Sequence, residues 1–166
     1  MMRNRGFEGV SKEHMKYKET VTVHGNTFEA YPYVKLPRRA DDRSAGYDFY
    51  SPVDMTILPG GQQVIWTNIK AYMQENEVLS IHPRSSLGIK QGIVLANTTG
   101  IIDASYYQNE GNDGNIGIAL KNTSGVAVHI KAGDRIAQGI FTGYLVVDND
   151  DPLSEERVGG IGSSGK

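Results

Sequence analysis

The chain has 166 residues, close to the usual size of one domain, and it contains no cysteine. The missing cysteines exclude disulfide bonds, thiolate metal sites and cysteine nucleophiles. A formal net charge of −2 gives no electrostatic argument for a nucleic-acid partner or a membrane surface.

The chain divides into three parts by composition. Residues 1–26 are basic and poor in apolar side chains, and we interpret them as a flexible or peripheral extension. Residues 27–147 alternate short apolar stretches with turn signals, at the spacing that is typical of β-sandwiches and barrels. Residues 148–166 are acidic around Pro152 and then rich in glycine, which predicts a mobile arm.

Glycine makes up 20 of the 166 residues, and such an excess favours many tight turns and an all-β domain. The alternation at 126–131 predicts that Val126, Val128 and Ile130 share one face of a strand. The predicted strands are Val64–Met73, Val78–His82, Ile116–Leu120, Val126–Lys131 and Arg135–Phe141.

No apolar run reaches the roughly 18 residues of a membrane span, and the first residues lack an apolar signal core. We therefore expect a cytoplasmic protein.

The C-terminal segment Gly160–Lys166 fits the GxxxxGK part of a phosphate-binding loop. An acidic stretch precedes it instead of the required strand, so a P-loop is rejected. The segment still offers the hydroxyl groups of Ser163 and Ser164, and Arg157 precedes it with a permanent positive charge. Such an arm could close over an anionic ligand, and the alternative is a disordered tail.

Two further segments combine residue types that suit nucleotide chemistry. Pro83–Gly88 places Arg84 beside two serines, which indicates a phosphate site or an ordinary polar turn. In Gly100–Tyr106, Asp103 is a candidate general base because an aspartate is ionised at neutral pH. Tyr106 offers a flat face to a sugar or base, and the alternative is a strand end with a surface Asp and a core Tyr.

Metal-ligand spacing is not found among the 4 histidines, so we assign no zinc site.

Taken in order, five segments of the chain resemble the five motifs of the trimeric dUTP pyrophosphatases (dUTPases), including phage and bacterial members. The segments are 45–51, 83–88, 97–106, 132–138 and 157–165, and the resemblance covers about residues 30–166.

The resemblance implies a jelly-roll-like, distorted β-barrel that forms a homotrimer. Its sites would lie at subunit interfaces, and the C-terminal arm would close over a site. The implied reaction is hydrolysis of dUTP to dUMP and pyrophosphate, which limits uracil in DNA and supplies dUMP for thymidylate synthesis. The implied partners are these nucleotides and other copies of the chain, with no nucleic acid or membrane.

The resemblance also assigns roles to individual residues. Asp103 would orient and deprotonate the attacking water, and Tyr106 would pack on the deoxyribose and exclude a 2′-hydroxyl. Asp48 would reach Mg²⁺ through a water, and Asp134 would brace the site by pairing with an arginine. Asn97 would bond the uracil edge with the nearby hairpin backbone. The substrate-binding residues would be Arg84, Ser85, Ser86, Asn97, Gly100, Ile102, Tyr106, Gln138, Arg157, Ile161, Gly162, Ser163 and Ser164.

Three features depart from the family pattern. Ile161 stands where the fifth motif usually has an aromatic residue, and Tyr107 is a candidate to cover the uracil instead. The acidic, glycine-rich segment 107–114 is longer than the usual turn and is expected to be an exposed loop. Residues 1–26 extend beyond the usual start, and we expect them to leave activity intact.

Two other functions remain as alternatives. A dCTP deaminase, including its bifunctional form, shares the fold, but it would need a catalytic Glu on the strand after the third motif, and residues 115–122 contain none. A regulatory or interaction protein would keep the nucleotide site as a switch and bind a protein partner through the 107–114 loop or residues 1–26.

Overall fold

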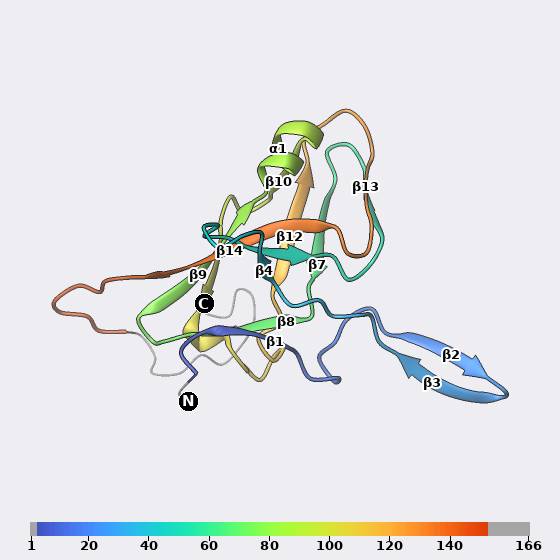
Figure 1. The fold of residues 1–166 in the computed structure, drawn as a ribbon, viewed down its shortest axis with the longest axis horizontal. Helices are drawn as coiled ribbons and strands as arrows, with labels where there is room; N and C mark the ends of the chain where they lie inside the picture. Colours follow the sequence, from blue (N-terminus) through green and yellow to red (C-terminus); the bar gives the residue numbers. More distant parts are fainter. Residues whose placement is uncertain (1–2, 153–166) are drawn as a thin grey trace.

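The computed structural model describes residues 3–152, which form an all-β body with one short α-helix (Figure 1). The strands are β1 Gly6–Gly9, β2 Glu19–Val23, β3 Asn26–Ala30, β4 Arg38–Arg39, β5 Tyr47–Tyr50, β6 Met55–Ile57, β7 Gln62–Trp66, β8 Ile69–Tyr72, β9 Glu77–Pro83, β10 Ile93–Leu95, β11 Gly100–Asp103, β12 Gly117–Asn122, β13 Val128–Ile130 and β14 Arg135–Gly143. Helix α1 (Ser85–Gln91) follows β9, and the 3₁₀ helix η1 (Ala104–Tyr106) follows β11. Residues 3–152 contain no helix that is long and apolar enough to cross a membrane. The predicted all-β class is confirmed.

The centre of the body is an antiparallel sheet of five strands in the order β11-β9-β14-β5-β4. A second sheet, β10-β12-β7, and the pair β13-β6 complete a distorted barrel around one core. Short strands of this kind bury one face each, so the sheets must pack against one another. The largest fully buried apolar side chains are Phe49, Ile57, Ile65, Ile69, Leu79, Ile93, Ile116, Ile118, Leu120 and Ile136.

The predicted strands correspond to observed ones, with two corrections. Val78–His82, Ile116–Leu120 and Arg135–Phe141 correspond to β9, β12 and β14. Val126, expected on a buried face, is 68% exposed because β13 begins only at Val128.

The single strand predicted over Val64–Met73 is two strands, β7 and β8. Asn68 lies between them with a φ of 57°, in the left-handed region that asparagine tolerates. Its side chain accepts the N–H of Lys16 at 2.8 Å and donates to the Lys16 carbonyl at 3.1 Å. The interruption therefore serves a contact with a segment far away in sequence, which local periodicity does not reveal.

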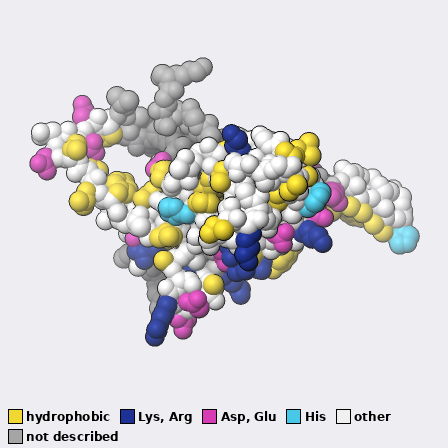
Figure 2. Space-filling view, turned by 90° about the horizontal axis from the view of Figure 1, so that it is seen from above, with side chains coloured by type: hydrophobic (Ala, Val, Ile, Leu, Met, Phe, Trp, Pro, Cys, Tyr) yellow, Lys and Arg dark blue, Asp and Glu magenta, His cyan; other side chains and the backbone are white. Residues whose placement is uncertain are grey.

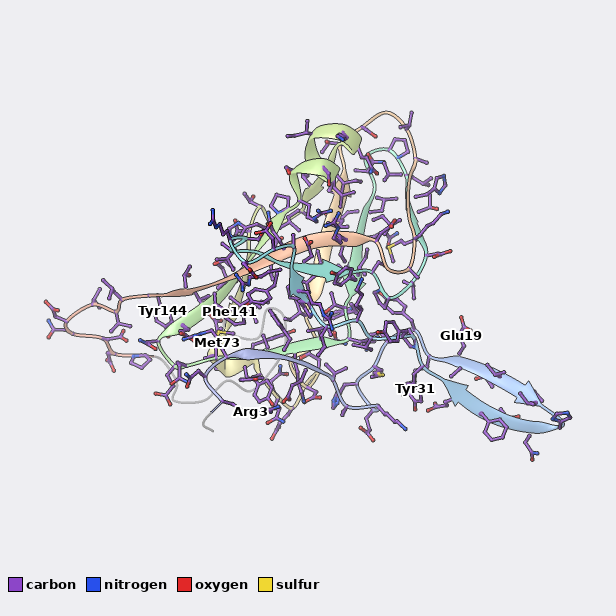
Figure 3. All side chains as sticks on the ribbon, viewed as in Figure 1. Arg3, Glu19, Tyr31, Met73, Phe141 and Tyr144 are labelled. Carbon is purple, nitrogen blue, oxygen red and sulfur yellow. The ribbon has the colours of Figure 1, made fainter. Side chains whose placement is uncertain are left out.

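Residues 6–16, which we call the N-terminal strap, pack against the body, in contrast to the peripheral extension that the sequence predicts. Strand β1 pairs with β8 along its whole length, and Val10 is 4% exposed. The Phe7 ring lies 5.5 Å from the Phe49 ring and 5.3 Å from that of Phe141, which lies beside β1 together with Met73 (Figure 3). These apolar contacts hold the strap in place.

Strands β2 and β3 form a hairpin that projects from the body (Figure 1), with Glu19 and Tyr31 at its base (Figure 3). Val21 lies opposite Phe28 in the register, and both are exposed. Figure 2 shows apolar side chains along the hairpin. The boundary expected after residue 26 falls inside this hairpin, because β3 begins at Asn26.

Gly139 lets β14 approach two buried side chains. A Cβ at this position would lie 2.9 Å from Leu79 Cδ1 and 2.9 Å from Phe49 Cε2. We predict that Gly139→Ala lowers the free energy of unfolding by about 1–3 kcal/mol, because the core must shift to accept the methyl group. Urea unfolding measures the change. Gly125→Ala is the control, since a Cβ there meets nothing within 4 Å, and equal effects of the two substitutions would contradict the prediction.

Candidate functional site

One cavity of about 200 Å³ lies between the β10–β11 connection and strand β12. It brings together four residues that the sequence assigns to substrate binding: Asn97, Gly100, Ile102 and Tyr106. The other lining residues are Ile81, Leu95, Ile101, Gly117, Ile118 and Ala119. The cavity therefore combines apolar walls with an amide side chain and strand backbone at its mouth, a pattern that suits a small flat ligand.

Local turn geometry places Asn97 in the turn between β10 and β11. Thr98 adopts a φ of 66° and donates its N–H to the Leu95 carbonyl at 3.2 Å. Gly100 keeps the neighbouring space open, because a Cβ there would lie 3.1 Å from the Cβ of Ile81 and 3.8 Å from the Asn97 amide nitrogen. A Cβ at position 100 would press on Ile81, whereas its distance to Asn97 is an ordinary contact.

Tyr106 forms a rigid wall of the cavity. Its side chain is 4% exposed, and its hydroxyl donates to the Asn115 carbonyl at 2.8 Å. The amide of Asn112 donates to the same hydroxyl at 2.6 Å. With its hydroxyl fixed from behind, the residue offers its ring to a ligand.

Asp103 ends strand β11, immediately before η1, and it is exposed. In the ladder it pairs with Val78, near the start of β9. An exposed carboxylate next to the cavity residues Ile102 and Tyr106 is accessible to water and to a ligand.

A second group of predicted residues gathers around Asp48 on β5. The Asp48 carboxylate is 7% exposed and contacts Arg84 Nε at 2.9 Å and Arg135 at 3.2 Å. Gln138 lies opposite Asp48 in the register and donates to the Pro83 carbonyl at 3.3 Å. Arg84 also contacts the Ser86 hydroxyl at 3.4 Å. We call Asp48, Arg84, Ser85, Ser86 and Gln138 the charged cluster.

Helix α1 is the reason that Ser86 meets Arg84. The sequence predicts a phosphate site or a turn here, whereas Ser85 opens a helix that ends at Gly92, with a φ of 68°. The helix directs Ser86 back toward the end of β9.

Asp103 and Arg84 lie at opposite ends of β9, and Ile81 of the same strand lines the cavity. Asp103 pairs with Val78, whereas Arg84 follows Pro83 at the other end of the strand. Six residues of extended strand separate Val78 from Arg84, which corresponds to about 20 Å. Within one chain, the candidate base and the candidate phosphate-binding arginine do not meet.

Two expected contacts differ in the structure. The Asp134 carboxylate accepts the N–H of Lys131 at 2.8 Å, and it forms no ion pair within residues 3–152. A tight turn brings this carboxylate to its own backbone, while the neighbouring Arg135 is bound to Asp48. Asp134 therefore caps a turn in this chain instead of pairing with an arginine.

Tyr107 does not cover the cavity. Its ring lies 6.0 Å from the Tyr72 ring and 5.3 Å from the Lys70 ammonium, and its hydroxyl donates to Glu8 Oε2 at 2.7 Å. These contacts direct the side chain toward the strap. The residues of the fifth motif, Arg157, Ile161, Gly162, Ser163 and Ser164, lie outside the described residues, so their roles stay predictions.

The 107–114 segment, expected to be an exposed loop, is packed in part. Asn109 and Gly114 are buried, and Asp113 pairs with Lys70 at 2.9 Å. Gly114 adopts a φ of 80°, and a Cβ there would lie 2.8 Å from the Tyr106 carbonyl. Sequence reasoning missed this arrangement, although a run of asparagine, aspartate and glycine is the usual signal for successive tight turns.

The domain is an all-β barrel with a small cavity, an exposed carboxylate and the charged cluster. These features suit a small phosphorylated ligand.

The dUTPase family model matches residues 32–165 of the chain. The deoxyuridine 5′-triphosphate nucleotidohydrolase of Lactococcus lactis subsp. lactis is 39% identical over 165 residues, which cover 99% of this chain and 99% of that protein. The protein of the same name from Clostridium tetani is 38% identical over 136 residues, 80% of this chain and 90% of that one.

Solved structures show the same relationship. The crystal structure of dUTPase from Streptococcus mutans has a TM-score of 0.71 and 35% identity, covering 87% of this chain and 99% of that chain. The dUTPase of Staphylococcus bacteriophage 80alpha has the same fold, with a TM-score of 0.65 at 21% identity over 92% of this chain and 98% of that chain. The chain belongs to the dUTPase family.

The contact between Glu8 and Tyr107 has an electrostatic signature. Burial, and then the bond to Glu8, raises the pKa of Tyr107 to about 12. The same bond, more than the ion pair with Arg3, lowers the pKa of Glu8 from its ordinary value of 4.5. Glu8 therefore stabilises the folded chain above that pH and loses this contribution as the pH falls through its lowered pKa.

We predict that Glu8→Gln lowers the melting temperature most at neutral pH and that the difference from the unsubstituted protein closes as the pH falls below about 4. The reason is that only the ionised carboxylate gives the full bond to Tyr107 and the ion pair with Arg3. Thermal unfolding followed by circular dichroism over this pH range measures the difference. A difference that does not change with pH would contradict the prediction.

Proposed function

We propose that the chain is a dUTP nucleotidohydrolase, which converts dUTP and water into dUMP and pyrophosphate. The observation that carries the proposal is the cavity, because Asn97, Gly100, Ile102 and Tyr106 line it together. These residues belong to the third family motif, so the cavity fits the nucleoside of the substrate. Membership of the dUTPase family supports the same reaction.

Uracil and deoxyribose would occupy the cavity. The Asn97 amide and the backbone groups of the β10–β11 connection would pair with the edge of uracil. Cytosine reverses the donor and acceptor pattern at that edge, and unpaired buried polar groups reject it strongly. The fixed ring of Tyr106 would pack on the deoxyribose and leave no room for a 2′-hydroxyl.

Asp103 would act as the general base. Its carboxylate would accept a proton from a water molecule, and the water oxygen would attack the α-phosphorus. A P–O bond forms at that phosphorus while the bond to the bridging oxygen of the β-phosphate breaks, so pyrophosphate leaves and dUMP remains. The exposed position of Asp103 beside the cavity residues is compatible with this role.

Arg84, Ser85, Ser86 and Gln138 would hold the phosphate groups. A cationic fork, two hydroxyls and an amide on adjacent elements provide charge-assisted donors for phosphate oxygens. The separation of about 20 Å along β9 means that the Asp103 and the Arg84 of one site would come from different copies of the chain. A homotrimer with sites between subunits meets this requirement, and residues 157–164 would complete the phosphate contacts.

Mg²⁺ would enter with the triphosphate. Within residues 3–152 no group of three or more His, Asp or Glu side chains could hold a metal by itself. Mg²⁺ commonly uses one or two carboxylates together with substrate phosphates and retained waters, and Asp48 could serve through such a water. The ion would neutralise charge on the phosphates as the bond breaks.

The deaminase and the regulatory protein remain the alternatives. Strand β12 follows the third motif and contains no glutamate, so it lacks the residue that deamination of dCTP would need. A nucleotide-switched regulatory protein would bind dUTP without turning it over.

We predict selective, Mg²⁺-stimulated release of pyrophosphate from dUTP when dUTP, dCTP, dTTP and UTP are compared. The cavity would accept only the uracil edge and the deoxy sugar, and the metal would offset charge on the phosphates. A coupled pyrophosphate assay measures release, and an ammonia assay runs beside it. Ammonia from dCTP would favour the deaminase, and no release from any nucleotide would favour the regulatory protein.

We predict that Asp103→Asn retains dUTP binding and loses turnover by at least about 10²-fold, because the amide cannot accept the proton of the attacking water. Turnover and calorimetric binding of dUTP are measured on the same preparation. Asp54→Asn, a matched change at an exposed residue outside the cavity and the charged cluster, serves as control. Unchanged turnover in Asp103→Asn would remove Asp103 from the role of base.

A further inference from the structure

The wall of the cavity rests on a network of asparagines behind it. We call residues 107–115 the asparagine loop. Asn109 donates to the Tyr106 carbonyl at 2.8 Å and to the Asn112 side chain at 2.8 Å, while Asn112 donates to the Tyr106 hydroxyl. The carbonyl of Asn115 accepts the same hydroxyl, and the Asn115 side chain is fully buried. The position of Tyr106 therefore follows the position of this loop.

The carboxylate of Asp113 attaches the asparagine loop to strand β8 and to the N-terminal strap. Asp113 contacts the Lys70 ammonium at 2.9 Å, and the Asp113 and Lys70 side chains are 12% and 8% exposed. The other partner of Asp113 is the backbone N–H of Ser11 in the strap, at 2.7 Å. One carboxylate thus joins the loop, strand β8 and the strap, and a charge buried in this way needs all of these partners.

Two more contacts join the same segments. Glu8 lies opposite Lys70 in the β1–β8 ladder and accepts the Tyr107 hydroxyl, one residue after Tyr106. The buried amide of Asn115 donates to the His14 carbonyl at 3.3 Å. The strap therefore contacts the asparagine loop at its first residue, Tyr107, and at its last residue, Asn115.

We propose that the N-terminal strap is a positioning element for Tyr106 and that it sets how strongly the enzyme discriminates 2′-deoxyribonucleotides from ribonucleotides. This inference rests on the proposed function, in which the Tyr106 ring packs on the deoxyribose. Excluding a single hydroxyl group requires the wall to be held within about 0.5 Å, and the strap supplies contacts that the asparagine loop cannot make by itself. The strap lies outside residues 32–165, which the dUTPase family model matches.

The test removes one strap contact without disturbing the core. Tyr107→Phe deletes the hydroxyl that reaches Glu8 and keeps the ring against Tyr72. Tyr31→Phe is the matched control, because it deletes a hydroxyl that contacts Glu29 at the base of the hairpin. Asp113→Asn is the stronger variant, since it removes the charge that meets Lys70 and Ser11.

The readout is the ratio of kcat/KM for dUTP to kcat/KM for UTP, together with the ratio of the affinities for dUMP and UMP from calorimetry. We expect both ratios to fall by about fivefold in Tyr107→Phe, the effect of one hydrogen bond, and further in Asp113→Asn. Tyr31→Phe should leave both ratios unchanged. A loss of folded protein lowers both rate constants equally, so it does not change either ratio.

If Tyr107→Phe and Asp113→Asn lowered kcat/KM equally for dUTP and UTP, the proposal would be overturned. The strap would then only stabilise the fold. An unsubstituted protein that prefers dUMP to UMP without hydrolysing dUTP would overturn the proposed hydrolysis, and the affinity ratio would still test the strap. An unsubstituted protein without any preference for dUMP would overturn the role of Tyr106 and, with it, this inference.

Discussion

Strand β9 fixes the distance between Asp103 and Arg84, two residues that the proposed hydrolysis of dUTP needs. Its first residues pair with Asp103 on β11, and its last residue leads into Arg84 and helix α1. Because an extended strand rises about 3.3 Å per residue, no side-chain movement brings these ends together. We therefore call Asp103 with the cavity residues one half-site and the charged cluster the other. If the proposed reaction uses Asp103 and Arg84 together, its substrate would lie between copies of the chain, and the reaction would depend on assembly.

The two half-sites are stabilised in different ways. The charged cluster holds itself together through Asp48, whose carboxylate lies between Arg84 and Arg135 on neighbouring elements of one sheet. The cavity depends on residues far away in sequence, because Tyr106 is fixed by the asparagine loop, and that loop is attached through Asp113 to Lys70 and the strap. Residues 6–16 are therefore part of the architecture behind the cavity, which no local motif indicates.

Many of the strands and several of the cavity residues were predictable from the sequence. Alternating apolar residues predict β9, β12 and β14, and the family motifs predict the grouping of Asn97 with Tyr106, both of which line the cavity. Sequence reasoning failed where a contact joins distant segments. The left-handed Asn68 ends β7 to meet Lys16, the turn at Asp134 uses that carboxylate for its own backbone, and Tyr107 faces Glu8. Local pattern does not reveal the contacts of Asn68 and Tyr107, because their partners lie 52 and 99 residues away in the sequence. At Asp134 the cause is different, since a local turn competes for the carboxylate.

Subunit complementation tests the separation of the half-sites most directly. Asp103→Asn and Arg84→Gln chains, each inactive alone, are co-expressed so that mixed trimers form. If each site takes Asp103 from one copy and Arg84 from another, every mixed ring has one intact site, and random assembly restores about one quarter of normal dUTP turnover. The two variants purified separately and mixed without subunit exchange should stay inactive. Co-expressed chains that form mixed trimers and remain inactive would contradict the account, because Asp103 and Arg84 would then act within one chain.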